Sequence, residues 1–187
     1  MIAAPAFAHR ALMSALAPHA LPEQKIVMNT ATGFGSLFLS RILADRNVRP
    51  TIIDLATIVR MSRISGPNRV RLGTLKPGVD FATIPAERGE AGGMLLTKLF
   101  GDLFVLKNSI LAISLNNHNP IYHIPAMVFN LPLVERRDDW NIWANMTPLI
   151  ARYVQKLGWR THGGCKVLWR GCDPTSSIRA YFCRSRR

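Results

Sequence analysis

The protein has 187 residues, of which 48% are hydrophobic, and a net charge of +13 at neutral pH. This hydrophobic content suffices for a packed core and argues against a disordered chain. No apolar run reaches the roughly 20 residues that span a bilayer, and the basic residue Arg10 follows the apolar start of the chain instead of preceding it as in a secretory signal. We therefore expect a soluble cytoplasmic protein and no membrane partner.

The first third of the sequence alternates between helical and strand patterns. The predicted elements are a helix over 5–19, a strand over 25–29, a helix over 37–45 and a strand over 51–55. Ser36 precedes the second helix and is predicted to cap it, and Gly33 and Gly35 form the turn before it. Helix, strand, glycine turn, helix and strand are the order of an α/β layer with a parallel sheet.

The pattern changes in the middle of the chain. Strands are predicted over 69–72, where basic and apolar residues alternate, and over 79–84, and their closeness indicates an antiparallel or mixed edge of the sheet. Helical spacing then dominates, over 94–100, 105–115, 120–130 and 148–157. We expect α/β followed by all-α: a partial Rossmann-type nucleotide-binding domain over 1–86 and a partial helical domain over 87–157.

The last segment, 158–187, shows neither period and is an indeterminate basic tail. It contains seven basic residues and one acid, so it supplies nearly half of the net charge. The three cysteines of the chain all lie here, at spacings that match no paired zinc ligands, and we predict no metal site. Its composition is what a read-through or a shifted reading frame would produce.

The basic residues of the body are scattered. They show no helical or heptad spacing. These residues are Arg41, Arg46, Arg49, Arg60, Arg63, Arg69 and Arg71. This distribution favours a solvated basic surface over a nucleic-acid groove. Part of the charge could instead attract an anionic cofactor or substrate.

A dense polar segment lies between two apolar helical runs. Five hydrogen-bonding side chains fall within eight positions: Asn116, Asn117, His118, Asn119 and His123. Asn119 and Pro120 suit the start of a helix, so the segment is either a capping system or a site, and periodicity alone favours caps. His123 lies one turn after Asn119 on the same helical face and could act as a general acid or base towards a carbonyl or hydroxyl; a structural role is the alternative.

The segment Asn119-Pro-Ile-Tyr-His123 resembles the Asn-Pro-x-x-His motif of opine dehydrogenases, the octopine and nopaline dehydrogenase family. Further stretches resemble the same family in the same order along the chain: 5–9, 29–35, 76–86 and 139–152. The resemblance covers roughly residues 3–157 and indicates a truncated member.

The resemblance implies an NAD- or NADP-dependent oxidoreductase that reduces the imine formed between an amino acid and a 2-oxo acid. His123 would be the catalytic acid or base, and Asn119 would orient the substrate or the nicotinamide. Hydride transfer would belong to the cofactor, and the protein would supply geometry and a proton. Cofactor-binding residues and the oligomeric state are not specified.

The sequence also departs from a complete enzyme. The fingerprint G-x-G-x-x-G is absent, because Gly33 and Gly35 have no third glycine after them. Three alternatives therefore stay open. They are a catalytically inactive remnant, a basic nucleic-acid-binding protein, and another dehydrogenase with the same two-domain plan.

Overall fold

The computed structural model describes residues 1–30, 34–115, 119–136, 141–142 and 144–161, except for the side chains of 74 and 158–161. These residues form two compact units, 1–117 and 118–187, and each is described by itself. The cysteines, His118, Asn116 and Asn117 lie outside the described residues, as does the tail beyond 161. No helix among the described residues is long and apolar enough to cross a membrane.

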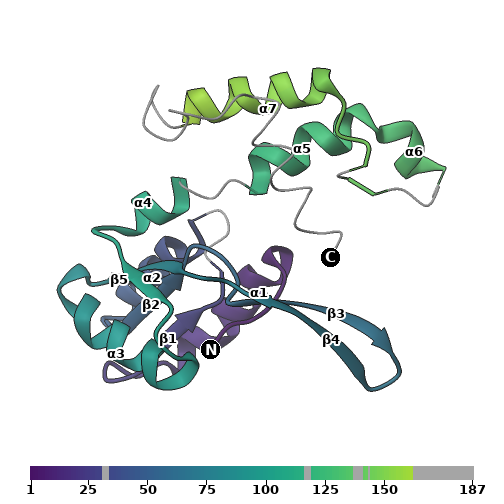
Figure 1. Ribbon diagram of the computed structural model, residues 1–187. Coiled ribbons are helices and arrows are strands. Elements are labelled where there is room, and N and C mark those ends of the chain that lie inside the picture. The colour runs from purple at the N-terminus through teal and green to yellow at the C-terminus, as the bar shows by residue number, and fades with distance from the viewer. Residues whose placement is uncertain (31–33, 116–118, 137–140, 143, 162–187) are drawn as a thin grey trace. The chain divides into compact units, whose positions relative to one another are not determined.

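Unit 1 is built on a four-stranded mixed sheet (Figure 1). Its strands, in spatial order, are β1 (Lys25–Met28), β2 (Thr51–Leu55), β5 (Val79–Ile84) and β6 (Phe104–Leu106). β1 and β2 are parallel, β2 and β5 are antiparallel, and β5 and β6 are parallel. The predicted mixed sheet is therefore confirmed, but the strand over 79–84 lies inside it and the strand predicted over 69–72 does not belong to it. Ile2 adds a single parallel bridge to Met28 on the outer side of β1.

Helices cover both faces of this sheet. On one face, α1 (Ala6–Leu16) and α2 (Gly35–Ala44) contribute Met13, Leu39 and Leu43 to a core with Ile52. On the other face, α3 (Gly89–Phe100) packs Leu96 against Val27, Ile53, Leu55 and Phe81. The alternation of side chains along β1 and β2 supplies both cores, which is why these strands read as continuous apolar runs.

A close approach between α3 and the sheet depends on Gly92. A Cβ atom at this position would lie 2.8 Å from Thr83 Cγ2 and 3.5 Å from Ile53 Cγ1. The expected division at 86 falls between β5 and α3, inside unit 1, because α3 and α4 (Ile110–Leu115) both pack on β5. The assignment of 87–157 to a helical domain stays a prediction.

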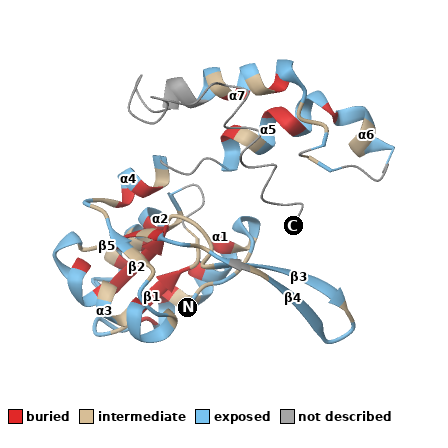
Figure 2. Ribbon diagram, in the orientation of Figure 1, coloured by how far each residue is buried: buried red, intermediate tan, exposed pale blue. Residues whose placement is uncertain are grey.

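A long hairpin projects from unit 1 (Figure 1). It consists of β3 (Arg60–Gly66) and β4 (Arg69–Leu75), which form a separate two-stranded antiparallel sheet. Only β4 was predicted, and it is longer than expected. Most of the described residues of both strands are exposed (Figure 2).

Unit 2 is helical. It contains α5 (Asn119–Phe129), α6 (Leu131–Glu135) and α7 (Pro148–Thr161). Its core joins Ile121 and Ala126 of α5 to Ile150 and Val154 of α7. The side-chain amide of Asn130 donates to the carbonyl of Ala126 at 2.8 Å, and this bond satisfies a carbonyl at the end of α5.

Two sequence predictions are wrong. The apolar stretch 105–115 is not one helix but contains the end of β6, a turn and α4. Ser36 does not cap α2, since the helix begins at Gly35 after Phe34 in a left-handed conformation, and the Ser36 side chain is fully buried. Both errors arise because packing against the sheet decides the local structure there.

Candidate functional site

The predicted catalytic pair lies on α5. Asn119 and His123 are separated by four residues, so they share one helical face, and both side chains are exposed. Ile121 and Pro125 are buried on the other side of the helix, and Ala126, one turn after His123, is buried as well. Asn119 is the first residue of the helix, one position later than an N-cap. The catalytic role of the pair stays a prediction.

A second polar cluster lies at the carboxyl ends of β1 and β2, where the turn into α2 begins. Met28 and Asp54 are paired in register, so both strands end at the same edge of the sheet. Polar atoms gather there without a hydrogen-bond partner among the described residues: His9 Nδ1, Asn29 Oδ1, Ser36 Oγ and both carboxyl oxygens of Asp54. In open α/β sheets, this edge is where ligands bind.

Asp54 is the most perturbed acid of the described chain. Its side chain is fully buried, and burial raises its pKa from 3.8 to about 7. The nearby Ser36 hydroxyl and Leu55 amide lower the pKa by smaller amounts, without reaching normal hydrogen-bond geometry. Asp54 is thus a proton-holding group near neutral pH.

His9 belongs to the same region. Its Nε2 lies 2.9 Å from the carbonyl oxygen of Ala4, which holds the ring in place. Its Nδ1 would lie 3.5 Å from a Cβ atom at Gly35. The imidazole therefore packs against the first turn of α2. The roles of His9 and Asp54 and the burial of Ser36 were not predicted from the sequence. The available signal was an acid inside the apolar strand of 51–55.

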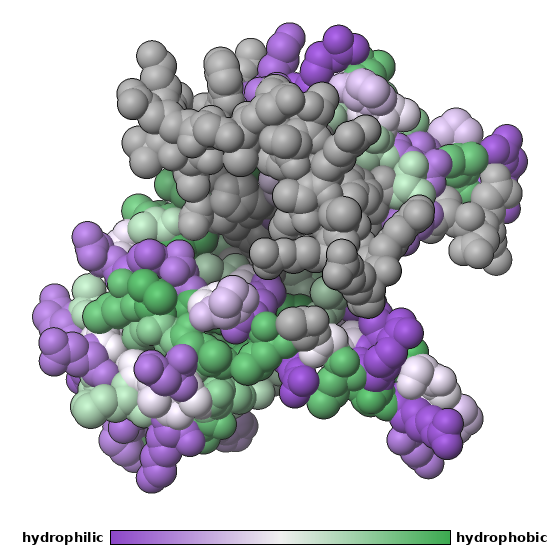
Figure 3. Space-filling model, viewed as in Figure 1, coloured by the Kyte–Doolittle hydropathy of each residue, from purple (hydrophilic) through white to green (hydrophobic). Residues whose placement is uncertain are grey.

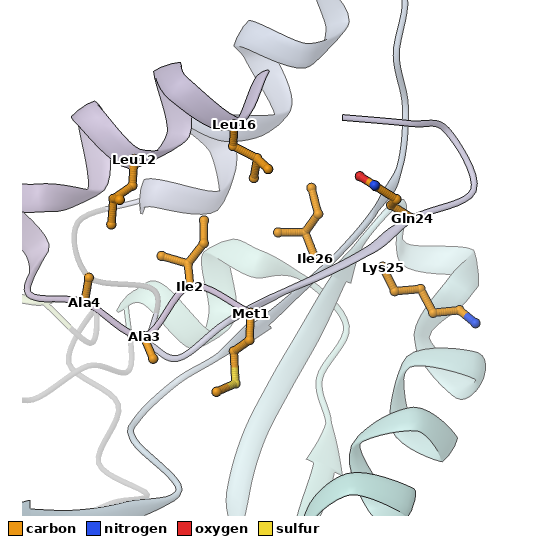
Figure 4. Close-up of a pocket in the computed structure, with 9 residues that line it drawn as sticks. All are labelled: Met1, Ile2, Ala3, Ala4, Leu12, Leu16, Gln24, Lys25 and Ile26. Carbon is orange, nitrogen blue, oxygen red and sulfur yellow. The ribbon is translucent and has the colours of Figure 1, made fainter. Parts of the chain in front are cut away.

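A pocket of about 540 Å³ opens at the outer edge of β1 (Figure 4). Its lining residues are Met1, Ile2, Ala3, Ala4, Leu12, Leu16, Gln24, Lys25 and Ile26. Ile2, Leu12, Leu16 and Ile26 surround the space. Its one ionisable side chain is Lys25, so this pocket contains no pair of groups for acid–base chemistry. Among the described residues, no His, Cys, Asp or Glu cluster could hold a metal ion.

The fold is similar to part of the fold of opine dehydrogenases. It combines a piece of a Rossmann-type domain with the start of a helical domain. Octopine dehydrogenase in complex with NADH and agmatine superposes with a TM-score of 0.60 over 92% of this chain and 45% of that chain, at 18% identity. Apo yersinopine dehydrogenase superposes with a TM-score of 0.62 over 75% of this chain and 36% of that chain, at 16% identity.

The sequence comparison agrees with the fold. An opine dehydrogenase of Arthrobacter sp. (strain 1C) is 24% identical over 161 residues, which are 84% of this chain and 44% of the relative. The chain thus spans less than half the length of this curated relative. No family model matches the sequence. The predicted resemblance is confirmed: the chain is opine dehydrogenase-like and short.

Proposed function

We propose that this chain is part of an NAD(P)-dependent oxidoreductase of the opine dehydrogenase type. Its substrates would be an amino acid and a 2-oxo acid, joined by reduction of their imine. Neighbouring structures support this class of substrate, since octopine dehydrogenase was solved with NADH and L-arginine and with NADH and pyruvate. The observation that carries the proposal is the exposed pair Asn119 and His123, one turn apart on α5.

The cofactor would lie at the carboxyl edge of β1 and β2. Residues there fit a nucleotide, because Asn29 and Thr30 are half-exposed, Asn29 Oδ1 has no partner among the described atoms, and α2 begins at this edge. A helix N-terminus favours phosphate groups. When bound, NAD(P)H would supply the hydride.

The remaining chemistry would belong to two side chains. His123 would exchange a proton with the nitrogen of the reacting amine or imine, and Asn119 would orient the substrate or the nicotinamide by hydrogen bonding. Since removal of a general acid or base typically lowers kcat by about 10²- to 10⁴-fold, the role of His123 is open to a direct kinetic test.

In the first experiment, the protein is titrated with NADH and with NADPH, and cofactor binding is monitored by fluorescence. Binding below millimolar concentrations supports the proposal, whereas no binding would indicate an inactive remnant. The second experiment measures cofactor oxidation with pairs of amino acids and 2-oxo acids in His123→Ala and in a control, His19→Ala, which removes another exposed imidazole. Equal rates in the two variants would refute the role of His123.

A further inference from the structure

The projecting hairpin has two chemically different faces. Its register places Arg63 opposite Arg71 and Ile64 opposite Val70. Because side chains alternate along a strand, Arg63, Arg69 and Arg71 share one face, called the basic face, and Ile64, Val70 and Leu72 share the other, called the apolar face. All six side chains are exposed, and Figure 3 shows hydrophilic and hydrophobic groups together on this arm. Near the base of the hairpin, Met61 lies on the basic face beside Gly73 and Arg60 follows the apolar face.

The positive charge of the basic face is uncompensated. Like charges directly opposite one another destabilise a strand pair, and the segment 60–75 contains no acidic residue. Within the described part of the chain, none of the three arginines makes an ion pair. The guanidinium group of Arg63 donates a hydrogen bond to the carbonyl oxygen of the adjacent residue Ser62, at 3.1 Å. An anion placed across Arg63 and Arg71 would therefore relieve a repulsion that the fold itself creates.

We propose that the basic face of this hairpin binds the phosphate backbone of duplex DNA. A two-stranded β-ribbon fits the major groove, and arginine forms strong, bidentate bonds to phosphate. The net charge of +13 adds long-range attraction. This activity is independent of the proposed dehydrogenase function, because it uses none of the same residues.

Other anionic partners fit the hairpin less well. Single-stranded nucleic acid is bound largely by stacking of bases on aromatic rings, and the segment 60–75 contains no aromatic residue. A membrane surface would take up the apolar face and leave the opposite, basic face in water, away from anionic headgroups. Duplex DNA needs only the charged face and the ribbon shape.

From the sequence alone, the basic residues predict a solvated surface, because they show no helical or heptad spacing. The three arginines instead follow strand spacing and come from two strands that pair through the turn at Gly66 and Asn68. The relevant grouping therefore exists only after the hairpin has formed. The same alternation was visible over 69–72, but without its partner strand.

The test uses the 187-residue chain and a labelled duplex of arbitrary sequence, with affinity measured by fluorescence anisotropy at several salt concentrations. The double variant Arg63→Gln/Arg71→Gln removes two charges from the basic face. The double variant Arg10→Gln/Arg49→Gln removes two exposed charges elsewhere in unit 1 and is the matched control. Circular dichroism would check that both variants are folded.

We expect the hairpin variant to bind roughly tenfold more weakly or worse at 0.1 M salt, with a log–log salt slope smaller by about two. The control should change both quantities much less. The variant Arg63→Lys/Arg71→Lys should keep most of the slope. Absence of binding by the unmodified protein, or equal losses in the two double variants, would overturn the proposal. So would stronger hairpin-dependent binding to poly-L-glutamate or to phosphatidylserine vesicles.

Discussion

The buried carboxyl group of Asp54 should make the stability of unit 1 depend on pH. In the folded protein this group has a pKa of about 7, whereas its ordinary value is 3.8. The folded state therefore binds the proton more tightly than the unfolded state. The protonated carboxyl group makes its full contribution to the free energy of unfolding below about pH 4, and this contribution is lost as the pH rises to about 7. Above that value the loss is complete.

The size of the effect follows from the width of this interval. A difference of roughly three pH units, at about 1.4 kcal/mol for each unit, corresponds to about 4 kcal/mol. This is a large share of the stability of a small domain. Asp54→Asn keeps the shape of the neutral acid and cannot ionise, so we expect it to be more stable than the unmodified protein at pH 8 and nearly equal at pH 4.

Amide hydrogen exchange of β2 measures this effect within unit 1. Protection of Ile52, Ile53 and Leu55 should fall between pH 4 and pH 7 in the unmodified protein, after correction for the intrinsic exchange rate, and should stay level in Asp54→Asn. Asp45→Asn, which changes an exposed acid on the surface, is the control and should preserve the slope. If Asp54→Asn retains the full slope, Asp54 is not the group responsible.

Three further substitutions test the packing of α3 and one buried hydrogen bond. Gly92→Ala should destabilise unit 1 by about 1 kcal/mol in urea unfolding, because the clash with Thr83 costs about 1–3 kcal/mol and the gain in helix propensity is about 1 kcal/mol. Gly89→Ala meets the flexible end of Leu106 instead, so it should be neutral or stabilising, and a reversed order would contradict this account. Asn130→Ala should destabilise unit 2 by about 1–3 kcal/mol, because it removes the buried hydrogen bond to Ala126. Hydrogen exchange of the α5 amides measures this loss of stability. Unchanged protection of these amides would argue against a role for that bond.

Buried strands were the part of the fold most accessible from sequence. The predicted bounds of β2 and β5 match the structure because each strand is a compact apolar run, and Pro85 ends β5. β6 was missed because pairing with β5 and ring contacts of Phe104 with Phe81 and Phe100 form it. Such non-local contacts leave no period in the sequence, so an apolar run of this length reads equally well as helix.

The candidate site also has a part that the sequence could predict and a part that it could not. The shared helical face of Asn119 and His123 was predictable, since they lie four residues apart within α5. Which face is buried was not, because the apolar residues Ile124 and Val128 of the same helix are exposed. The polar cluster around Asp54 was not, because it joins α1, α2 and two strands that are far apart in the chain. Ser36 illustrates the reason: its position suggested a cap, but burial beside Asp54 depends on how α2 packs on the sheet.

The bridge of Ile2 to β1 matters for how the protein is produced. The amide of Ile2 donates to the carbonyl of Val27 at 2.7 Å, and the amide of Asn29 donates to the carbonyl of Ile2 at 2.9 Å. Any residues fused ahead of Met1, such as a purification handle, would leave directly from this bridge beside an apolar opening. A charged or bulky added segment would interfere with the pairing of Ile2 with β1, whereas a short spacer of glycine and serine would leave this pairing intact.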